Sequence, residues 1–193
     1  FDPHPLSVIH PEAEPKLLMP FPVKRDVIEG LGVEELVVIP FDRDFAAIDP
    51  DEFVERILIG QLGATQVAVG ENFRFGRAAA GDGALLERLG FDVRLVPLLE
   101  GVSSTRIRSQ LRDGDVVAAA QLLGRPAEIE GVVVLGDQRG GTLGYPTANL
   151  AVPADLLVPA YGIYAGSALG HRAAMSIGVN PHYGGDERRI EPY

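Results

Sequence analysis

The chain has 193 residues, which is enough for one domain or two small ones around a buried core. Its composition is 46% hydrophobic and 23% charged, as in ordinary globular proteins, and a net charge of −10 with no basic half argues against a nucleic-acid surface. The absence of cysteine excludes disulfides and thiolate metal sites, and the lack of a long apolar run or a signal peptide predicts a cytoplasmic protein.

The first hundred residues alternate short apolar runs with amphipathic stretches. Residues 23–32 and 50–60 carry apolar side chains at helical spacing, and Asp49 followed by Pro50 marks a helix start. The β-branched runs around them are typical of buried strands, namely 36–40, 66–69 and 93–97. Strands and helices in alternation predict an α/β, Rossmann-like parallel sheet.

Ligands of such sheets bind beyond the carboxyl ends of the strands. Three loop segments fall at these ends: FDPHP (1–5), PFDR (40–43) and GENFRFG (70–76). We therefore expect them to gather around one ligand site.

Two helices are predicted next, followed by a change of character. Ser103 or Ser104 can cap the first helix, and Asp113 or Asp115 the second, which should end at Gly124. Beyond residue 128 the helical period is lost, and short strands separated by glycine and proline turns predict a small antiparallel β-barrel or sandwich. The sequence thus divides into domains at 1–126 and 127–193.

The stretch GDQRGGTLGYPTANL (136–150) carries the clearest chemical signal. Thr147 and Asn149 are two residues apart, so an extended chain directs both side chains to one face, where their oxygens suit Mg²⁺. Glycines such as Gly136 and Gly144 let backbone N–H groups approach a phosphate. An ordinary loop between two strands has the same composition, so the stretch alone leaves both interpretations open.

A second signal is VSSTRIR (102–108), in which two serines, a threonine and two arginines stand at a helix start. Free N–H groups, hydroxyls and guanidinium groups at such a start favour a bound anion, including a triphosphate. A plain helix cap followed by solvated arginines is the alternative.

Taken together, the motifs closely resemble bacterial bifunctional FAD synthetases. The C-terminal motifs, from GDQRGGTLGYPTANL through SIGVNPHYGGDERRIEPY (176–193), resemble the flavokinase module of that family. The upstream motifs FDPHP, GENFRFG and VSSTRIR look like its adenylyltransferase module. The resemblance runs in order along essentially the whole chain, so it is far more specific than any single motif.

The resemblance implies a role for residues in both modules. In the kinase module it implies Thr147 and Asn149 as Mg²⁺–ATP residues, with Gly136 and Gly144 at the phosphates, and Glu191 as the base on the riboflavin 5′-hydroxyl. In the adenylyltransferase module it implies a larger set: Ser104, Thr105 and Arg108 at the ATP phosphates, Asn72 at the reacting phosphate and the flavin, and Phe73, Pro3 and Pro5 at the flavin. His4 receives no chemical role.

The implied activities are phosphorylation of riboflavin to FMN and adenylylation of FMN to FAD, both with ATP and Mg²⁺. Small molecules are the expected partners, nucleic acid and membrane are not, and homo-oligomerisation is left open. The family's HxGH motif does not occur in the sequence, and both domains are expected to be incomplete, the first at its N-terminus and the second at its C-terminus. Two rivals remain: a non-catalytic flavin- or nucleotide-binding module, and a related nucleotidyltransferase with another substrate.

Overall fold

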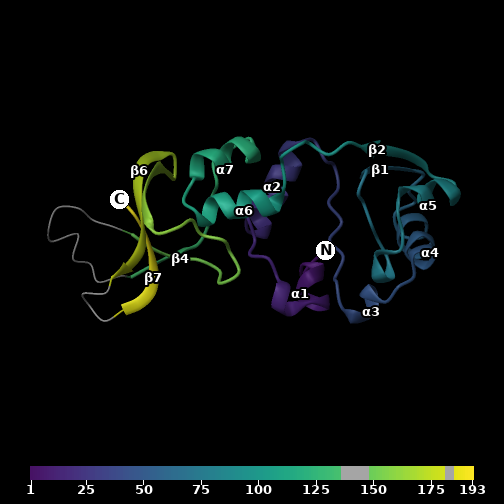
Figure 1. The fold of residues 1–193 in the computed structure, drawn as a ribbon, viewed down its shortest axis with the longest axis horizontal. Coiled ribbons are helices and arrows are strands. Elements are labelled where there is room, and N and C mark those ends of the chain that lie inside the picture. The colour runs from purple at the N-terminus through teal and green to yellow at the C-terminus, as the bar shows by residue number, and fades with distance from the viewer. Residues whose placement is uncertain (136–147, 181–184) are drawn as a thin grey trace. The chain divides into compact units, whose positions relative to one another are not determined.

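The computed structural model describes residues 1–135, 148–180 and 185–193 (Figure 1). By their internal contacts the residues form two compact units. Unit 1 consists of residues 1–15 and 35–101, and unit 2 consists of residues 16–34 and 102–193. The two units are described in turn, and the domain boundary near 126 stays a prediction.

Unit 1 contains one pair of parallel strands, as the sequence predicts. Strand β1 (Gln66–Gly70) pairs with β2 (Asp92–Val96) in register from Gln66 opposite Asp92 to Gly70 opposite Val96. Helix α5 (Gly83–Arg88) lies in the crossover between them, and the Asp82 carboxylate caps it by accepting from Leu85 N at 2.9 Å.

The remaining elements of unit 1 are short helices. They are α1 (Pro5–Ile9), η1 (Pro11–Ala13), α3 (Arg43–Ala46), α4 (Pro50–Phe53), η2 (Val54–Ile59) and η3 (Arg77–Ala79). The helix predicted at 50–60 is confirmed as α4 running into η2, a π-helical stretch. Asp49 occupies the cap position, but its carboxylate pairs with Arg77 at 2.7 Å and accepts no capping hydrogen bond.

The prediction of a strand at residues 36–40 is wrong, because the structure has no strand there. This segment makes only an isolated parallel bridge, in which Asp2 N donates to Ile39 O at 3.1 Å and Phe41 N donates to Asp2 O at 3.0 Å. Val37 and Val38 remain more than 40% exposed. A β-branched run becomes a strand only when a neighbouring chain satisfies its backbone, and here Asp2 alone does so.

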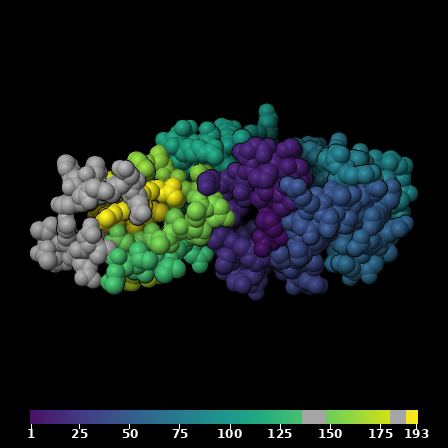
Figure 2. Space-filling model, turned by 90° about the horizontal axis from the view of Figure 1, so that it is seen from below, coloured from purple at the N-terminus to yellow at the C-terminus, as the bar shows by residue number. Residues whose placement is uncertain are grey.

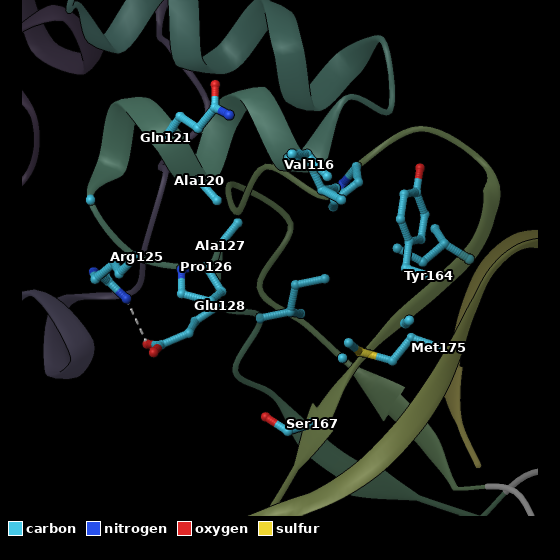
Figure 3. A pocket seen from close by; sticks show the side chains of 17 residues that line it. Val116, Ala120, Gln121, Arg125, Pro126, Ala127, Glu128, Tyr164, Ser167 and Met175 are labelled. Carbon is cyan, nitrogen blue, oxygen red and sulfur yellow. Dashed lines mark ion pairs between the residues drawn. The ribbon is translucent and has the colours of Figure 1, made fainter.

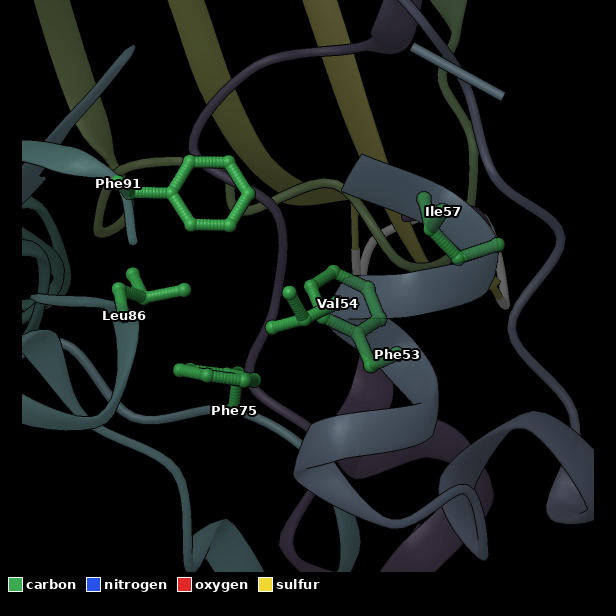
Figure 4. Close-up of a cluster of buried hydrophobic side chains, with 6 residues drawn as sticks. All are labelled: Phe53, Val54, Ile57, Phe75, Leu86 and Phe91. Atoms are coloured by element: carbon green, nitrogen blue, oxygen red, sulfur yellow. The ribbon is translucent and has the colours of Figure 1, made fainter. Parts of the chain in front are cut away.

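The core of unit 1 is an aromatic and aliphatic cluster, drawn in Figure 4: Phe53, Val54, Ile57, Phe75, Leu86 and Phe91. Helices α4, η2 and α5 turn their apolar faces toward it. Gly81 is required beside this cluster, because a Cβ there would lie 2.7 Å from the Phe75 ring.

Unit 2 begins with three helices: α2 (Phe21–Gly30), α6 (Ser104–Arg112) and α7 (Val116–Leu123). The capping predictions are confirmed for α6 and α7. Ser103 Oγ accepts from Arg106 N at 3.2 Å, and Asp115 Oδ1 accepts from Ala118 N at 2.9 Å. Helix α7 ends at Gly124, which has a left-handed φ of 72° that other residues rarely adopt.

The strands of unit 2 form two antiparallel sheets. Strands β3 (Val132–Val134) and β4 (Asn149–Ala151) make the first, and β5 (Gly162–Ala168), β6 (His171–Asn180) and β7 (Gly185–Pro192) make the second in the order β5-β6-β7. In the space-filling view, the yellow C-terminal residues lie among the green residues of unit 2, in keeping with the pairing of β7 with β6 (Figure 2).

The predicted barrel is not closed within the residues that the structure describes. Its two sheets are separate ladders, although Ala148 N donates across to Pro192 O at 3.2 Å. Two apolar clusters support unit 2, one containing Ile107, Leu111, Ala119 and Leu157 and the other Val158, Ile177 and Ile190. Across the described ranges, none of the helices is long and apolar enough to span a bilayer.

Candidate functional site

Asn149 and Glu191, which are 42 positions apart in the sequence, are brought together by the link between β4 and β7. The hydrogen bond from Ala148 N to Pro192 O joins the residues next to them. Leu150 and Ile190 pack in one cluster, so alternation along each strand directs Asn149 and Glu191 to the opposite face. Both candidates are half-buried and lie on a shared face.

The neighbours of Glu191 follow from the strand register. Ser176 on β6 is directly opposite Glu191, and Ile163 on β5 is opposite Ser176. Arg189, two residues before Glu191, belongs to the same face of β7. A carboxylate in this position has a hydroxyl and a guanidinium group on its own face of the sheet.

Three other kinase candidates, Gly136, Gly144 and Thr147, lie outside the described residues. Among the residues that are described, no three His, Asp or Glu side chains are grouped as a metal site. Asn149 offers a hard amide oxygen, which suits Mg²⁺ because this ion is usually held by one or two protein oxygens, phosphates and water. Asn149 alone among the described candidates is therefore suited to a magnesium ion that it would share with a phosphate and water.

The α6 candidates occupy the exposed side of an amphipathic helix. Ser104 and Thr105 are exposed in its first turn, and Arg108 follows one turn later on the same side. The opposite side is buried through Ile107 and Leu111. Because Ser103 provides the cap, the hydroxyls of Ser104 and Thr105 are not used for capping.

Arg108 is held more firmly than a solvated arginine. Its Nε donates to Lys16 O at 2.8 Å. Desolvation lowers the pKa of the Arg108 guanidinium, and the nearby charge of Arg112 lowers it further. The sequence motif gave no indication of the contact with Lys16, since the two residues are 92 positions apart.

In unit 1, Asn72 lies just beyond the carboxyl end of β1, where the sequence places a ligand loop. Phe73 N donates to Gly70 O at 2.9 Å, which tightens this turn. Asn72 is exposed and Phe73 is half-buried, stacked on Phe75 with ring centroids 5.6 Å apart.

The loop at residues 1–5 is bound through Asp2 to residues 39–41 and leads into α1. The peptide bond before Pro3 is cis, and Pro5 is the first residue of α1. His4 Nδ1 accepts from Leu6 N at 3.2 Å, so this histidine is a helix cap, a role that sequence analysis missed.

A chain of phenylalanine rings joins this loop to the Asn72 loop. Its rings are in contact in the order Phe1, Phe41, Phe45, Phe53, Phe75 and Phe73, with centroids 5.2 to 6.1 Å apart. The three loop segments predicted to gather are thus connected through one set of aromatic contacts.

A cavity of unit 2 lies elsewhere. It has a volume of about 730 Å³ and is lined by α7, residues 124–129, β5 and β6 (Figure 3). Tyr164 and Met175 lie on one side of it, and Arg125 pairs with Glu128 at 3.0 Å on another. None of the predicted site residues lines it, and no sequence motif indicated it.

A parallel strand pair in unit 1 and antiparallel sheets in unit 2 that carry Asn149 and Glu191 on one face fit a nucleotidyltransferase joined to a flavokinase. Comparison with known families agrees. The FAD synthetase model matches residues 1–111, and the riboflavin kinase model matches residues 123–193. The chain belongs to the FAD synthetase family.

Individual relatives extend this result. The chain is 36% identical to a bifunctional riboflavin kinase/FMN adenylyltransferase of Bacillus subtilis over 86% of its own length and 54% of that protein. It is 34% identical to the enzyme of the same name from Escherichia coli K12, over 99% of its length and 65% of that protein. The chain thus spans between 54% and 65% of the length of these two relatives.

The fold is also similar to a solved structure. A crystal structure described as a macrolide-efflux protein from Streptococcus pneumoniae superposes with a TM-score of 0.79 and 33% identity. The match covers 91% of this chain and 60% of that one.

Proposed function

We propose that the protein is a bifunctional enzyme of flavin biosynthesis. Its kinase reaction transfers the γ-phosphate of ATP to riboflavin, giving FMN and ADP. Its adenylyltransferase reaction transfers AMP from a second ATP to FMN, giving FAD and pyrophosphate. The observation that carries the proposal is the shared face of Asn149 and Glu191, where an amide oxygen and a carboxylate could serve one site as metal ligand and base.

In the kinase reaction, Glu191 acts as general base. Its carboxylate accepts the proton of the riboflavin 5′-hydroxyl as that oxygen attacks the γ-phosphorus and ADP leaves. Asn149, with Thr147 before it, would hold Mg²⁺, whose charge offsets the negative charge of the phosphates. The position of Glu191 favours this role, because its half-buried carboxylate lies on the same face as Asn149.

In the adenylyltransferase reaction, α6 binds the donor phosphates. Ser104 and Thr105 offer hydroxyls and N–H groups in its first turn, and Arg108 offers a guanidinium group from the same side. An FMN phosphate oxygen attacks the α-phosphorus of ATP and pyrophosphate leaves. Asn72 is proposed to orient the reacting phosphates, and Phe73, Pro3 and Pro5 to contact the flavin.

The proposed setting is the cytoplasm, and small molecules are the proposed partners. The net charge of −10 disfavours nucleic acid as a partner. The phosphates of ATP would therefore be bound by a few specific side chains and N–H groups. Oligomerisation of the protein is compatible with either reaction.

The test is to supply the purified protein with riboflavin, ATP and MgCl₂ and to separate the flavins by chromatography. We expect FMN and then FAD to accumulate, and FMN formation to require both Asn149 and Glu191. Binding of riboflavin without turnover, by a protein that is folded, would favour the non-catalytic flavin-binding alternative.

A further inference from the structure

Residues 16–19 of unit 2 form a connection that neither the family resemblance nor the proposed reactions use. Lys16 makes two hydrogen bonds, one through its backbone and one through its side chain. Its carbonyl accepts from Arg108 Nε on α6, and its Nζ donates to the carbonyl of Ala154, both at 2.8 Å. Lys16 therefore joins α6 to the segment that follows β4.

The next residue strengthens this connection. Leu17 forms a parallel bridge with Leu156, in which Leu17 N donates to Asp155 O and Leu157 N donates to Leu17 O, each at 2.8 Å. Leu156 is 2% exposed, and Leu18 packs against the cluster that contains Leu157. Residues 16–18 are thus bound to residues 154–157 by backbone, side-chain and apolar contacts together.

The bound segment begins close to Asn149. Strand β4 ends at Ala151, and only Val152 and Pro153 separate it from Ala154. Proline fixes its own φ and restricts the residue before it, so little conformational freedom remains between Ala154 and the strand. Fixing Ala154 therefore limits the movement of the strand that presents Asn149.

We propose that Lys16 is a positioning residue for the kinase reaction, acting through Ala154 on Asn149, and that Arg108 supports it by orienting its backbone. The proposal rests on the proposed function of Asn149 as a ligand of Mg²⁺–ATP. Arg108 then has two tasks, because its Nε donates to Lys16 O and the same side chain is proposed to bind the donor phosphates.

The test is Lys16→Met, which keeps the aliphatic stem and removes the donor. Because Lys16 is exposed, we expect the variant to fold. The KM for Mg²⁺–ATP in FMN formation should rise about 3- to 10-fold, as for loss of one partly exposed charged hydrogen bond, with kcat within about 2-fold of wild type. Lys16→Arg, which can still donate to Ala154, should restore most of the affinity.

Lys24→Met is the matched control. It makes the same substitution at another exposed lysine of residues 16–34, on α2, and changes the net charge equally. Its KM should equal that of the wild type. Arg108→Ala should raise the kinase KM in the same direction as Lys16→Met.

Amide hydrogen exchange at Leu17 and Leu157 provides a readout that does not depend on catalysis. Faster exchange together with a raised KM in Lys16→Met supports the proposal. Faster exchange with an unchanged KM would mean that Lys16 is only structural, and no change in either would mean that it is an ordinary surface lysine, so both results overturn it. A wild type without kinase activity but with protected Leu17 and Leu157 would reject the proposed function instead.

Discussion

Glu191 and Asn149 are brought together by a backbone hydrogen bond between their neighbours and by the packing of Leu150 near Ile190. Substitutions at these two residues therefore test the proposed kinase site most directly. Glu191→Gln keeps the shape of the side chain and removes its basicity. We expect FMN formation to fall by about 10²- to 10⁴-fold, the usual contribution of a general base. FAD formation from supplied FMN should stay near the wild-type rate.

Both rates can be measured on one preparation by separating the flavins. Glu130→Gln is a suitable control, since it removes an exposed carboxylate that comes just before β3. If Glu191→Gln formed FMN as fast as the control, Glu191 would be an ordinary partner of the neighbouring arginines.

Arg108 is the second residue whose role can be measured. Its charge-assisted hydrogen bonds to a phosphate in a partly desolvated site would be worth about 1.5–3 kcal/mol, or about 10- to 150-fold in rate. We expect Arg108→Ala to slow FAD formation from FMN by this factor while the kcat of FMN formation persists. Arg108→Lys should recover only part of the rate, because a point charge cannot replace the planar guanidinium group.

The control for this prediction is Arg112→Ala, which removes a charge one turn further along α6. An unchanged rate of FAD formation in Arg108→Ala would assign the arginine to the contact with Lys16 alone.

Single residues were predictable where local chemistry dictates them. Ser103 and Asp115 were each one of two cap candidates named from the sequence, and Gly124 was named as a helix end, because a cap needs only a polar side chain or a free φ at one position. The contact of Arg108 with Lys16 and the capping role of His4 could not be predicted in the same way. The contact of Arg108 with Lys16 forms only when the folded chain brings the two residues together. His4 was missed because histidine is an uncommon helix cap.

At the scale of elements, the cap of α7 can be tested by Asp115→Ala. The variant loses the hydrogen bond from Ala118 N, and we expect a destabilisation of about 0.5–2 kcal/mol. This corresponds to a decrease in Tm of a few degrees for a chain of this length, about 2–4 °C per kcal/mol. Calorimetry measures it, and Asp113→Ala, at the other side of the turn, should change Tm much less.

A second prediction at this scale concerns the loop that closes on the unit 1 core. In Gly81→Ala the new methyl group would meet the Phe75 ring, so overpacking should cost about 1–3 kcal/mol. Gly30→Ala is the contrasting control, because its Cβ meets nothing within 4 Å and alanine favours a helix. Urea denaturation should therefore move the two midpoints in opposite directions.

Element boundaries could be predicted where start and stop signals are present, as in α6 and α7. The parallel pair β1–β2 was also predicted. Its two β-branched runs pair with each other, so each has the neighbouring strand that it needs. Residues 36–40 have an equally good composition but only one bridge, because strand formation depends on a neighbour that composition does not reveal.

For the whole molecule, two separate sites predict that the two reactions can be removed independently. Asn149→Ala should lose FMN formation and keep FAD formation from FMN, and Arg108→Ala should do the reverse. Neither variant alone should make much FAD from riboflavin. An equal mixture of the two should make FAD, because FMN released by one protein is a substrate for the other.

A time course of FAD formation in the mixture measures this complementation. Each variant alone, at the total protein concentration of the mixture, serves as a control. Failure of the folded variants to complement each other would contradict separate sites that exchange free FMN.

The pairing of Leu17 with Leu156 has a consequence for how the chain folds during synthesis. The bond from Lys16 to Ala154 alone spans 138 positions of sequence. A ribosome releases the chain from its N-terminus, so residues 16–34 emerge long before the segment that binds them. All residues of unit 1 are available once residue 101 has been made, whereas the pairing of residues 16–18 in unit 2 must wait for residue 157. During this interval Leu17 and Leu18 lack their final contacts with residues 155–157, so this segment docks late in the synthesis of the chain.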